Sequence, residues 1–471
     1  MRRLLLLSIF YTIFSFIGCK NKSTNTDKVY IGGKIVNPNL DYIILSRDAD
    51  IIDTLGLDKN NQFGQYLENI DPGIYTLQHN PENQVVYLEP GDSIMIWVNT
   101  YAFDESLNFS GRGSKESSFL LNLFLQNRAN NDLVLNYYKI KPEKFEKISD
   151  SIHQKRLEEF NLISSQRNFS DDFKNMARQS IDYEYYDLRE RYTYLIKKYY
   201  PEYAKLIPKD FNNYRDSIDF NNGLLQNYYL YTNTIDDYLR TRAVEYCIDK
   251  HKDRDCFNVS DFDNIQRRAI LIDSLSSTPS IKNRFLDILL SKAVTISSND
   301  EDLKKVMNLA ESLDYQQIDQ IKQLSSIQKN YFTGKSLANF TLLNTNGVET
   351  TYGDIINKKT IIYFWSANNI RRYIWQFRTI KKLEEKYPEL DFIGVNLDIG
   401  HEKRWLRILN ENNYDQKNQY QLSKRKFSND YATKYLYRLN FLDKNAVIVR
   451  GDVALSSSAE FESQLLQFIN Q

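Results

Sequence analysis

Between residues 28 and 112, short apolar runs alternate with turn-forming residues. The runs are Val29–Val36, Tyr42–Leu45, Gly73–Leu77, Val85–Leu88 and Ile94–Val98. Stretches rich in Asn, Asp, Pro and Gly separate them. Short strands punctuated in this way are typical of a small antiparallel β sandwich or barrel. We therefore predict a β domain over residues 28–112.

Residues 115–328 show a helical pattern instead. Apolar and aromatic side chains recur at three- and four-residue steps, and one such stripe is Phe173, Ala177, Ile181, Tyr185, Leu188, Tyr192 and Leu195. This spacing predicts amphipathic helices. An aromatic stripe usually forms core, although tyrosines also suit a partner surface. No repeat period is evident, so a helical solenoid stays an open alternative.

Residues 331–471 alternate between strand and helix patterns. The predicted strands are Phe340–Leu342, Thr360–Trp365, Leu390–Leu397, Leu439–Leu442 and Ala446–Val449. Apolar positions at helical spacing follow the second strand, between Ile370 and Leu383. Alternation of this kind predicts an α/β sheet covered by helices on both faces.

Composition narrows the class of protein. The chain has 471 residues, with 61 Lys and Arg against 61 Asp and Glu. A chain without net charge is a poor candidate for nucleic-acid binding, which needs a basic surface. Three Cys and four His exclude a disulfide-dense or multi-zinc scaffold. The length and the apolar fraction of 42% suit a folded protein of about three domains.

The first 27 residues predict export and a membrane anchor. Two arginines precede a nearly apolar run from Leu4 to Gly18, which is short for a bilayer-spanning helix and suits a secretory signal over residues 1–18. The end of the run, Phe16–Cys19, resembles a bacterial lipobox, in which the Cys becomes acylated. The resemblance implies a lipidated Cys19 and a polar tether over residues 19–27. An ordinary signal peptide or a membrane anchor is the alternative. We expect a periplasm-facing position at the outer membrane.

The C-terminal segment resembles the thioredoxin-like family of membrane-tethered disulfide reductases and peroxiredoxin relatives, of the TlpA/ResA type. The matching stretches are Gly334–Leu342, Asn346–Gly347, Tyr352–Ile355, Ile361–Ser366 and Phe392–Asp398. The resemblance covers about 140 residues and implies a thioredoxin-like fold. The N-terminal segment is similar to a β domain of unknown function common in envelope lipoproteins. The stretches that carry this likeness are Gly33–Ile35, Leu88–Asp92 and Phe109–Gly113.

The active-site cysteines of that family are missing. Its Cys-x-x-Cys lies at a helix start, where the dipole and free backbone N–H groups favour a thiolate. Asn369 and Arg372 occupy the two positions here, and residues 331–471 contain no Cys. The cis-Pro that holds substrate in the family is also replaced, by Tyr437 on our alignment. The reductase activity of the family is therefore transferred to no residue of this chain, and we expect neither a catalytic residue nor a cofactor there.

Two other chemistries remain open. Asn369, Arg371 and Arg372 at a helix start form a candidate anion site, with two solvated arginines as the alternative. Cys247 and Cys256 are candidates for a disulfide across a short loop in an oxidising compartment, or they are two unpaired thiols. Cys247 and His251 share a helix face, but Cys-x₃-His-x₄-Cys lacks a fourth metal ligand. We therefore predict no metal site.

The sequence thus favours an envelope lipoprotein with a redox-inactive thioredoxin-like domain that binds or scaffolds a peptide or protein. Motif searches for a nucleophile elbow, a phosphate loop or a zinc-protease helix are negative. The alternatives are a thiol–disulfide oxidoreductase acting through Cys247 and Cys256, and a small-ligand sensor at Arg371 and Arg372.

Overall fold

The computed structural model describes residues 28–47, 50–79, 82–251, 255–367, 370–423, 433–436, 438–455 and 459–471. The predicted signal peptide, tether and Cys19 lie outside these ranges. The chain divides into two compact units, the first made of residues 1–79, 83–126 and 169–174, and the second of residues 80–82, 127–168 and 175–471. None of the helices in the described ranges is long and apolar enough to cross a bilayer.

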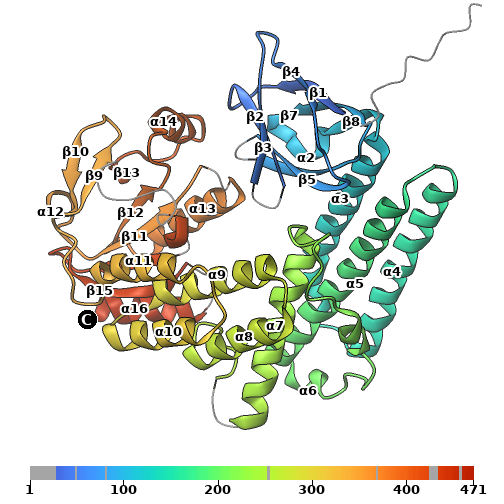
Figure 1. The fold of residues 1–471 in the computed structure, drawn as a ribbon. Helices are drawn as coiled ribbons and strands as arrows, with labels where there is room; N and C mark the ends of the chain where they lie inside the picture. The colour runs from blue at the N-terminus through green and yellow to red at the C-terminus, as the bar shows by residue number, and fades with distance from the viewer. Residues whose placement is uncertain are drawn as a thin grey trace, which may run out of the picture. The chain divides into compact units, whose positions relative to one another are not determined.

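The N-terminal domain consists of two four-stranded sheets (Figure 1). One has the order β4-β1-β7-β8 and the other β3-β2-β5-β6. The strands are β1 (Val29–Val36), β2 (Tyr42–Arg47), β3 (Asp50–Gly56), β4 (Gln62–Leu67), β5 (Gly73–His79), β6 (Glu82–Leu88), β7 (Ser93–Asn99) and β8 (Asn108–Arg112). A short turn of helix, η2 (Thr100–Ala102) with α2 (Phe103–Ser106), follows β7. Alternate residues of β5 and β7 point into one core, as the two-residue period of a half-buried strand requires.

One pairing departs from the predicted antiparallel arrangement: β1 and β7 run parallel, with Gly33 opposite Ile96. The two strands approach closely there, because a Cβ on Gly33 would lie 1.9 Å from the carbonyl oxygen of Ile96. Glycine is the one residue that fits this position without moving backbone.

The middle of the chain is helical, as predicted. Its helices are α3 (Ser114–Tyr137), α4 (Pro142–Ser165), α5 (Asp171–Tyr199), α6 (Pro201–Ala204), α7 (Tyr229–Lys250), α8 (Phe262–Leu275), α9 (Pro279–Ile296), α10 (Asp300–Ser312) and α11 (Ile318–Gln328), with the 3₁₀ turns η3 (Asn213–Ser217) and η4 (Lys329–Tyr331). Proline opens α4 and α9, where a missing N–H costs nothing. Asp261 and Asn299 cap α8 and α10 with their side chains.

The C-terminal region is a seven-stranded sheet with the order β10-β9-β13-β12-β11-β14-β15. Its elements are β9 (Thr341–Asn344), β10 (Glu349–Thr351), α12 (Tyr352–Ile355), β11 (Thr360–Trp365), α13 (Ile370–Lys386), β12 (Asp391–Asn396), α14 (Glu402–Glu411), β13 (Gln419–Leu422), η5 (Thr433–Tyr435), β14 (Arg438–Leu442), β15 (Ile448–Ala454) and α16 (Ala459–Asn470). β11, β12 and β13 are parallel, and β14 and β15 form an antiparallel hairpin. A βαβ unit followed by a hairpin and a last helix is the arrangement that the thioredoxin-like resemblance implies.

Two of the predicted strands differ in position. β9 covers Thr341–Asn344 instead of Phe340–Leu342, and β15 covers Ile448–Ala454 instead of Ala446–Val449. Ala446 lies in the turn before β15 with φ +58°. The Asp443 carboxylate accepts hydrogen bonds from the N–H groups of Asn445 and Val447 at 2.9 Å each. These bonds fix the turn, so that the strand begins only at Ile448.

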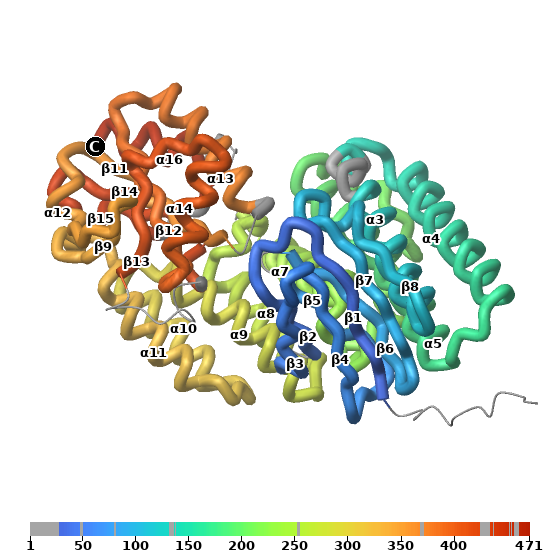
Figure 2. The backbone as a smooth tube through the Cα atoms, turned by 90° about the horizontal axis from the view of Figure 1, so that it is seen from above, coloured from blue at the N-terminus to red at the C-terminus, as the bar shows by residue number. Residues whose placement is uncertain are grey.

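Within the second unit, the helical region and the C-terminal sheet are packed together. Helix α9 contacts β15 and η5. Figure 2 shows α9, α10 and α11, in yellow, beside the orange and red C-terminal region.

Candidate functional site

The parallel strands β11 and β12 end beside each other, and the carboxylate of Asp398 joins the two ends. Asp398 is buried. It accepts hydrogen bonds from the Ser366 hydroxyl at 2.5 Å and from the Ala367 backbone N–H at 2.6 Å. The Asn396 amide donates to it at 3.0 Å. A buried carboxylate is tolerated only with such donors, so Asp398 fixes the backbone just after β11, ahead of the positions Asn369 and Arg372 that the predicted resemblance aligns with two cysteines.

Side chains from three other elements hold the same corner. Arg404 of α14 donates to the carbonyl of Ala367 at 3.0 Å, and Gln376 of α13 donates to that of Phe364 at 3.0 Å. Gln421 of β13 donates to the carbonyl of Asp398 at 2.8 Å. The chain's own polar groups therefore set the shape of this loop, and none of these side chains is a thiol.

The predicted anion site lies partly outside the described residues. Asn369 is not described, and of Arg371 only the backbone position in the first turn of α13 is given. The guanidinium of Arg372 lies over the ring of Trp375, 4.7 Å from its centroid. Asp398 already places a carboxylate on the N–H of Ala367, three residues before the first residue of α13. An external anion bound here would therefore lie close to the carboxylate of Asp398.

The segment before β14, in which the predicted resemblance places the substituted cis-Pro, contacts the helical region. Tyr437 itself lies outside the described residues, but its neighbours on both sides are described. Lys434 forms an ion pair with Asp287 of α9 at 2.7 Å, and the Tyr435 hydroxyl hydrogen-bonds Gln328 of α11 at 3.0 Å. This edge of the sheet is thus occupied by the protein's own helices.

Arg438, the first residue of β14, is the centre of that contact. Its guanidinium is buried and donates to the side-chain oxygen of Gln328 at 2.7 Å and to the carbonyl of Tyr331 at 3.1 Å. It also donates to the carbonyl of Thr295 in α9. The rings of Tyr331 and Tyr435 each lie 5.7 Å from the guanidinium carbon, within the range of a cation–π contact. One cation therefore links α9, α11, η4 and β14.

Cys247 and Cys256 are joined in a disulfide, with their Cα atoms 5.6 Å apart. Cys247 lies in the last turns of α7, and its carbonyl accepts the N–H of His251, which ends the helix. Cys256 is buried, whereas Cys247 is half-buried. Both line a cavity of about 310 Å³. Among the described residues, no group of three His, Cys, Asp or Glu side chains is placed to hold a metal ion.

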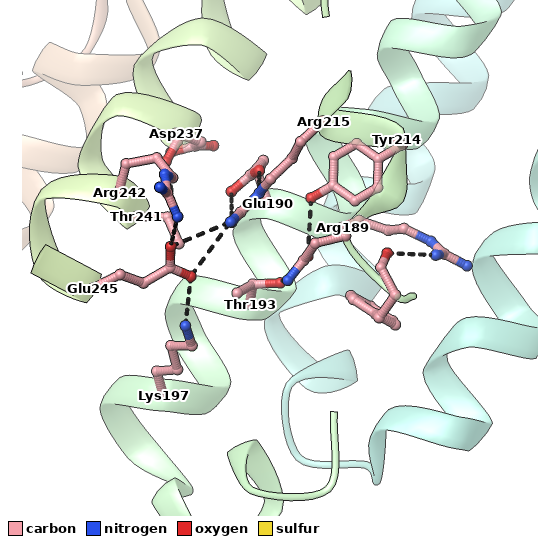
Figure 3. Close-up of polar contacts among 12 residues, drawn as sticks. Arg189, Glu190, Thr193, Lys197, Tyr214, Arg215, Asp237, Thr241, Arg242 and Glu245 are labelled. Carbon is pink, nitrogen blue, oxygen red and sulfur yellow. Dashed lines mark hydrogen bonds and ion pairs between the residues drawn. The ribbon is translucent and has the colours of Figure 1, made fainter. Parts of the chain in front are cut away.

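A buried ion network links α5, η3 and α7 in the helical region (Figure 3). Arg215 binds Glu190 through two hydrogen bonds, of 2.5 and 2.9 Å, and reaches Glu245 at 3.2 Å. Lys197 binds Oε1 of Glu245 at 2.5 Å, and Arg242 binds Oε2 of the same carboxylate at 2.7 Å. Burial alone would raise the pKa of Glu245, but these three cations together lower it. Each carboxylate of this network is paired with at least one cation, and these ion pairs connect α5, η3 and α7.

Sequence reasoning missed Asp398, Gln328 and Arg438 as site residues. Asp398 had a readable signal, because an acid directly after an apolar strand lies at the carboxyl edge of a parallel sheet. Gln328 and Arg438 had none, since a single polar residue at the end of a helix or the start of a strand has no periodic signature.

Three solved structures illustrate what part of this chain is similar to. The thioredoxin domain of a thiol-disulfide oxidoreductase from Bacteroides vulgatus is 21% identical, with 29% of this chain and 98% of that one covered and a TM-score of 0.23. A thiol:disulfide interchange protein from Bacteroides sp. is 20% identical, with 30% and 91% covered and a TM-score of 0.23. A thiol-disulfide oxidoreductase from Bacteroides fragilis is 17% identical, with 28% and 96% covered and a TM-score of 0.21.

No protein-family model matches the chain, and no curated protein matches it. At the identities above, likeness does not transfer an activity, and the chemistry rests on the residues of this chain.

Proposed function

We propose that the protein is an envelope lipoprotein whose thioredoxin-like region works without redox chemistry, as a scaffold that binds a peptide or protein. The observation that carries this proposal is the contact before β14. Lys434, Tyr435 and Arg438 bind α9 and α11 at the edge where a reductase of this family holds its substrate.

The polar corner after β11 supports the same conclusion. A reductase needs a thiolate at this place, and residues 331–471 contain no Cys. Asp398 and its donors replace a reactive centre with a closed set of hydrogen bonds. Such a corner adds rigidity to a domain without adding a nucleophile.

An insulin-reduction assay tests the redox part of the proposal. The purified chain should show no dithiol turnover above the rate of the reductant alone. The Cys247→Ser/Cys256→Ser variant should match it, and a purified thioredoxin provides the positive control. Turnover by the wild type that survives this double substitution would overturn the proposal, because the C-terminal region would then carry an unrecognised redox centre.

The binding part is tested by affinity capture from envelope extracts, with the partner identified by mass spectrometry. A partner of the scaffold should be retained by the wild type and by Arg407→Met, an exposed substitution on α14. The Arg438→Met variant should lose it, because it loosens the contact between α9 and β14. Repeated recovery of no defined partner, or equal recovery with all three chains, contradicts a scaffold that depends on this contact.

Membrane attachment belongs to the same proposal and rests on the lipobox-like stretch before Cys19. Replacement of Cys19 by Ser should move the protein from the membrane fraction to the soluble periplasmic fraction. A Lys20→Ser variant, one residue further along the tether, should stay with the membrane. A Cys19→Ser chain that is still extracted only by detergent would contradict a lipid anchor.

A second candidate function is thiol–disulfide exchange through Cys247 and Cys256. It is favoured by one observation: the half-buried Cys247 and its partner line a cavity. Attack by an external thiolate on Cys247 would form a mixed disulfide and release Cys256 as a thiolate. Insulin turnover that disappears in Cys247→Ser would favour this candidate over the scaffold.

Ligand sensing at Arg371 and Arg372 is the third candidate. Titration with carboxylates and phosphates should give the same response for the wild type and for Arg371→Ala/Arg372→Ala if the arginines are only solvated.

A further inference from the structure

A second cavity, of about 140 Å³, lies among α7, α8 and α9, and its charged lining is unbalanced. Three cations border it, Arg240, Arg268 and Lys292, with Asp236 as the acid among the lining residues. Asp236 is already ion-paired with Arg240, which also binds Asp237 at 2.9 Å. The positive charge of Arg268 and Lys292 is therefore left without a counter-ion inside the cavity lining.

Arg268 is the deepest of these cations. It is 5% exposed, and its one hydrogen bond goes from Nη2 to the carbonyl of Val259 at 2.7 Å. Its Nε is buried and has no acceptor, and no carboxylate among the described residues lies within ion-pair distance of it. A buried guanidinium in this state is costly, because it has lost its water and gained neither a full set of acceptors nor an opposite charge.

The other buried arginines of the described chain each have a carboxylate partner or several oxygen acceptors. Arg156 pairs with Glu184 at 3.2 Å, and Arg189 pairs with Asp150 at 2.7 Å. Arg438 donates to three oxygen atoms and lies against two tyrosine rings. Arg438 shares with Arg268 a buried Nε that has no acceptor, but its other nitrogens reach three oxygen atoms. Arg268 has one acceptor and no carboxylate partner, and it lines a cavity.

The electrostatics of the neighbouring groups agree with an unfilled anion position. Burial lowers the pKa of Arg268 to about 10, and Arg240 adds to this effect while Asp236 opposes it. Although part of the Lys292 side chain is exposed at the mouth of the cavity, desolvation by the surrounding groups and the charges of Arg268 and Arg240 also lower the pKa of Lys292. Each cation is thus destabilised by its surroundings, and a bound anion would relieve both.

The remaining walls of the cavity are apolar. Leu239, Ile272, Phe285 and Leu289 line it and are buried. Ile288 and Lys292 line it and are exposed, so they mark its mouth. A bare oxyanion would leave these apolar walls unfilled, whereas a carboxylate with a few carbon atoms would bury its tail against them.

We propose that this cavity binds a small carboxylate with a short apolar tail, and that the carboxylate pairs with Arg268 at the bottom and with Lys292 at the mouth. The proposal is independent of the scaffold function, since none of these residues contributes to the contact before β14.

The test is thermal unfolding of the full-length chain in detergent with three probes: isovalerate, the neutral amide isovaleramide, and inorganic phosphate. Isovalerate should raise the melting temperature in a saturable manner, and the other two should not. Equal shifts with isovalerate and isovaleramide would overturn the role of charge. A shift with phosphate as large as that with isovalerate would overturn the role of the apolar walls, and so would the absence of any shift.

Two arginine variants separate binding from folding. Arg268→Met keeps the length of the side chain and removes the uncompensated charge. It should raise the melting temperature of the unliganded chain by about 2–4 °C and abolish the response to isovalerate. Arg156→Met is the matched control: it leaves Glu184 buried and unpaired, so it should lower the melting temperature and keep the response. An Arg268→Met chain that still responds to isovalerate overturns the site.

Lys292→Gln decides the case if Arg268→Met does not fold. Lys292 is exposed, so this chain should fold like the wild type and bind isovalerate about two- to fivefold more weakly, as expected for one exposed ion pair. Unchanged affinity in Lys292→Gln would count against the proposed position of the carboxylate.

Discussion

The guanidinium of Arg438 donates a 2.7 Å hydrogen bond to the side-chain oxygen of Gln328, and this bond joins the first residue of β14 to the last residue of α11. Both side chains are buried. The contact makes the helical region and the C-terminal sheet parts of one unit. It also buries the first residue of β14 against α9 and α11.

Replacement of Arg438 by Met should destabilise this unit by about 3 kcal/mol. The substitution removes the Arg438 donor from the buried carbonyls of Thr295 and Tyr331 and leaves Gln328 with the Tyr435 hydroxyl alone, which costs more than the net value of the bonds themselves. The midpoint of urea unfolding, followed by circular dichroism, measures the effect. Arg407→Met on the exposed face of α14 is the control and should change stability by less than about 0.5 kcal/mol. Equal midpoints for the two variants would show that the contact is not structural.

Asp398→Asn should cost about 1–3 kcal/mol. The amide has one acceptor oxygen where the carboxylate has two, and its NH₂ group would face either the Ser366 hydroxyl, which donates to Oδ1, or the donors on Ala367 and Asn396, which share Oδ2. Hydrogen exchange should increase at the Ala367 amide before global unfolding. Asp319→Asn, at an exposed position on α11, should leave the exchange of Ala367 unchanged. Wild-type protection of that amide in Asp398→Asn would show that the carboxylate is not its essential partner.

The disulfide should stabilise the helical region by roughly 2–3 kcal/mol, because it closes a short loop in the unfolded chain. Cys247→Ser/Cys256→Ser should therefore unfold at lower urea concentration than the wild type under oxidising conditions. Dithiothreitol should lower the wild-type midpoint to that of the double variant and leave the variant unaffected. If dithiothreitol lowered the urea midpoint of both chains equally, its effect would not come from the Cys247–Cys256 disulfide.

The stability of the N-terminal domain should fall as the pH rises through 7. Burial raises the pKa of Asp92 to about 7. The N–H of Glu89, 2.9 Å away, partly opposes the shift, and the charge of Glu116 adds to it. Because the unfolded chain ionises near pH 4, the stability present below that pH is lost between pH 4 and 7.

Asp92→Asn should remove that part of the pH dependence, on the order of 2 kcal/mol, because the amide oxygen still accepts the Glu89 N–H and carries no charge. Urea midpoints of the two chains at pH 4.5 and pH 8 measure the difference. Asp41→Asn, at an exposed position, should follow the wild type at both values. A constant gap between Asp92→Asn and the wild type across this range would contradict the raised pKa.

Glu190→Gln should destabilise the helical region by about 3 kcal/mol, because Arg215 keeps its burial and loses its bidentate carboxylate (Figure 3). The comparison is Glu202→Gln, which breaks an exposed ion pair with Lys205 and should cost less than about 1 kcal/mol. Chemical unfolding of both chains in parallel gives the two values. Similar losses would mean that burial does not govern the strength of these pairs.

The parts of the fold that the sequence predicted well are those with strong local periodicity. The predicted strands Val29–Val36 and Thr360–Trp365 match β1 and β11 residue for residue. The stripe along residues 173–195 lies within α5, where Phe173, Ala177, Ile181 and Leu188 are buried. In each case apolar residues at one spacing meet a core, and no distant partner is needed to specify the element.

The missed elements have polar residues where a core strand usually has apolar ones. β13 contains Gln419 and Gln421, which are buried because their amides bind groups of the same sheet: Gln419 reaches β11, two strands away, and Gln421 reaches β12. Gln419 bonds the Tyr363 hydroxyl at 2.8 Å and the Trp365 indole at 3.2 Å. β3 was missed for another reason: its adjacent apolar residues Ile51 and Ile52 are both exposed, so they do not alternate between a core face and a solvent face. Neither β13 nor β3 therefore shows the apolar–polar alternation that predicts a half-buried strand.

The candidate sites were harder to predict than the fold. The sequence showed that the C-terminal segment has no cysteine, and the short separation of Cys247 and Cys256 made them candidates for a disulfide. It held no signal for Arg438 and Gln328, which lie 110 residues apart. It held none for Arg268 either, because an arginine is recognised as uncompensated only when its whole surroundings are known.

The position of β1 in its sheet has a mechanical consequence for a chain tethered by its N-terminus. β1 lies between β4 and β7 and is paired along six residues with the first and seven with the second. A pull on residue 28 along the strand would load both ladders in shear, so that many bonds must break together rather than one after another. Under the proposed anchoring at Cys19, β1 would be the strand that withstands this tension.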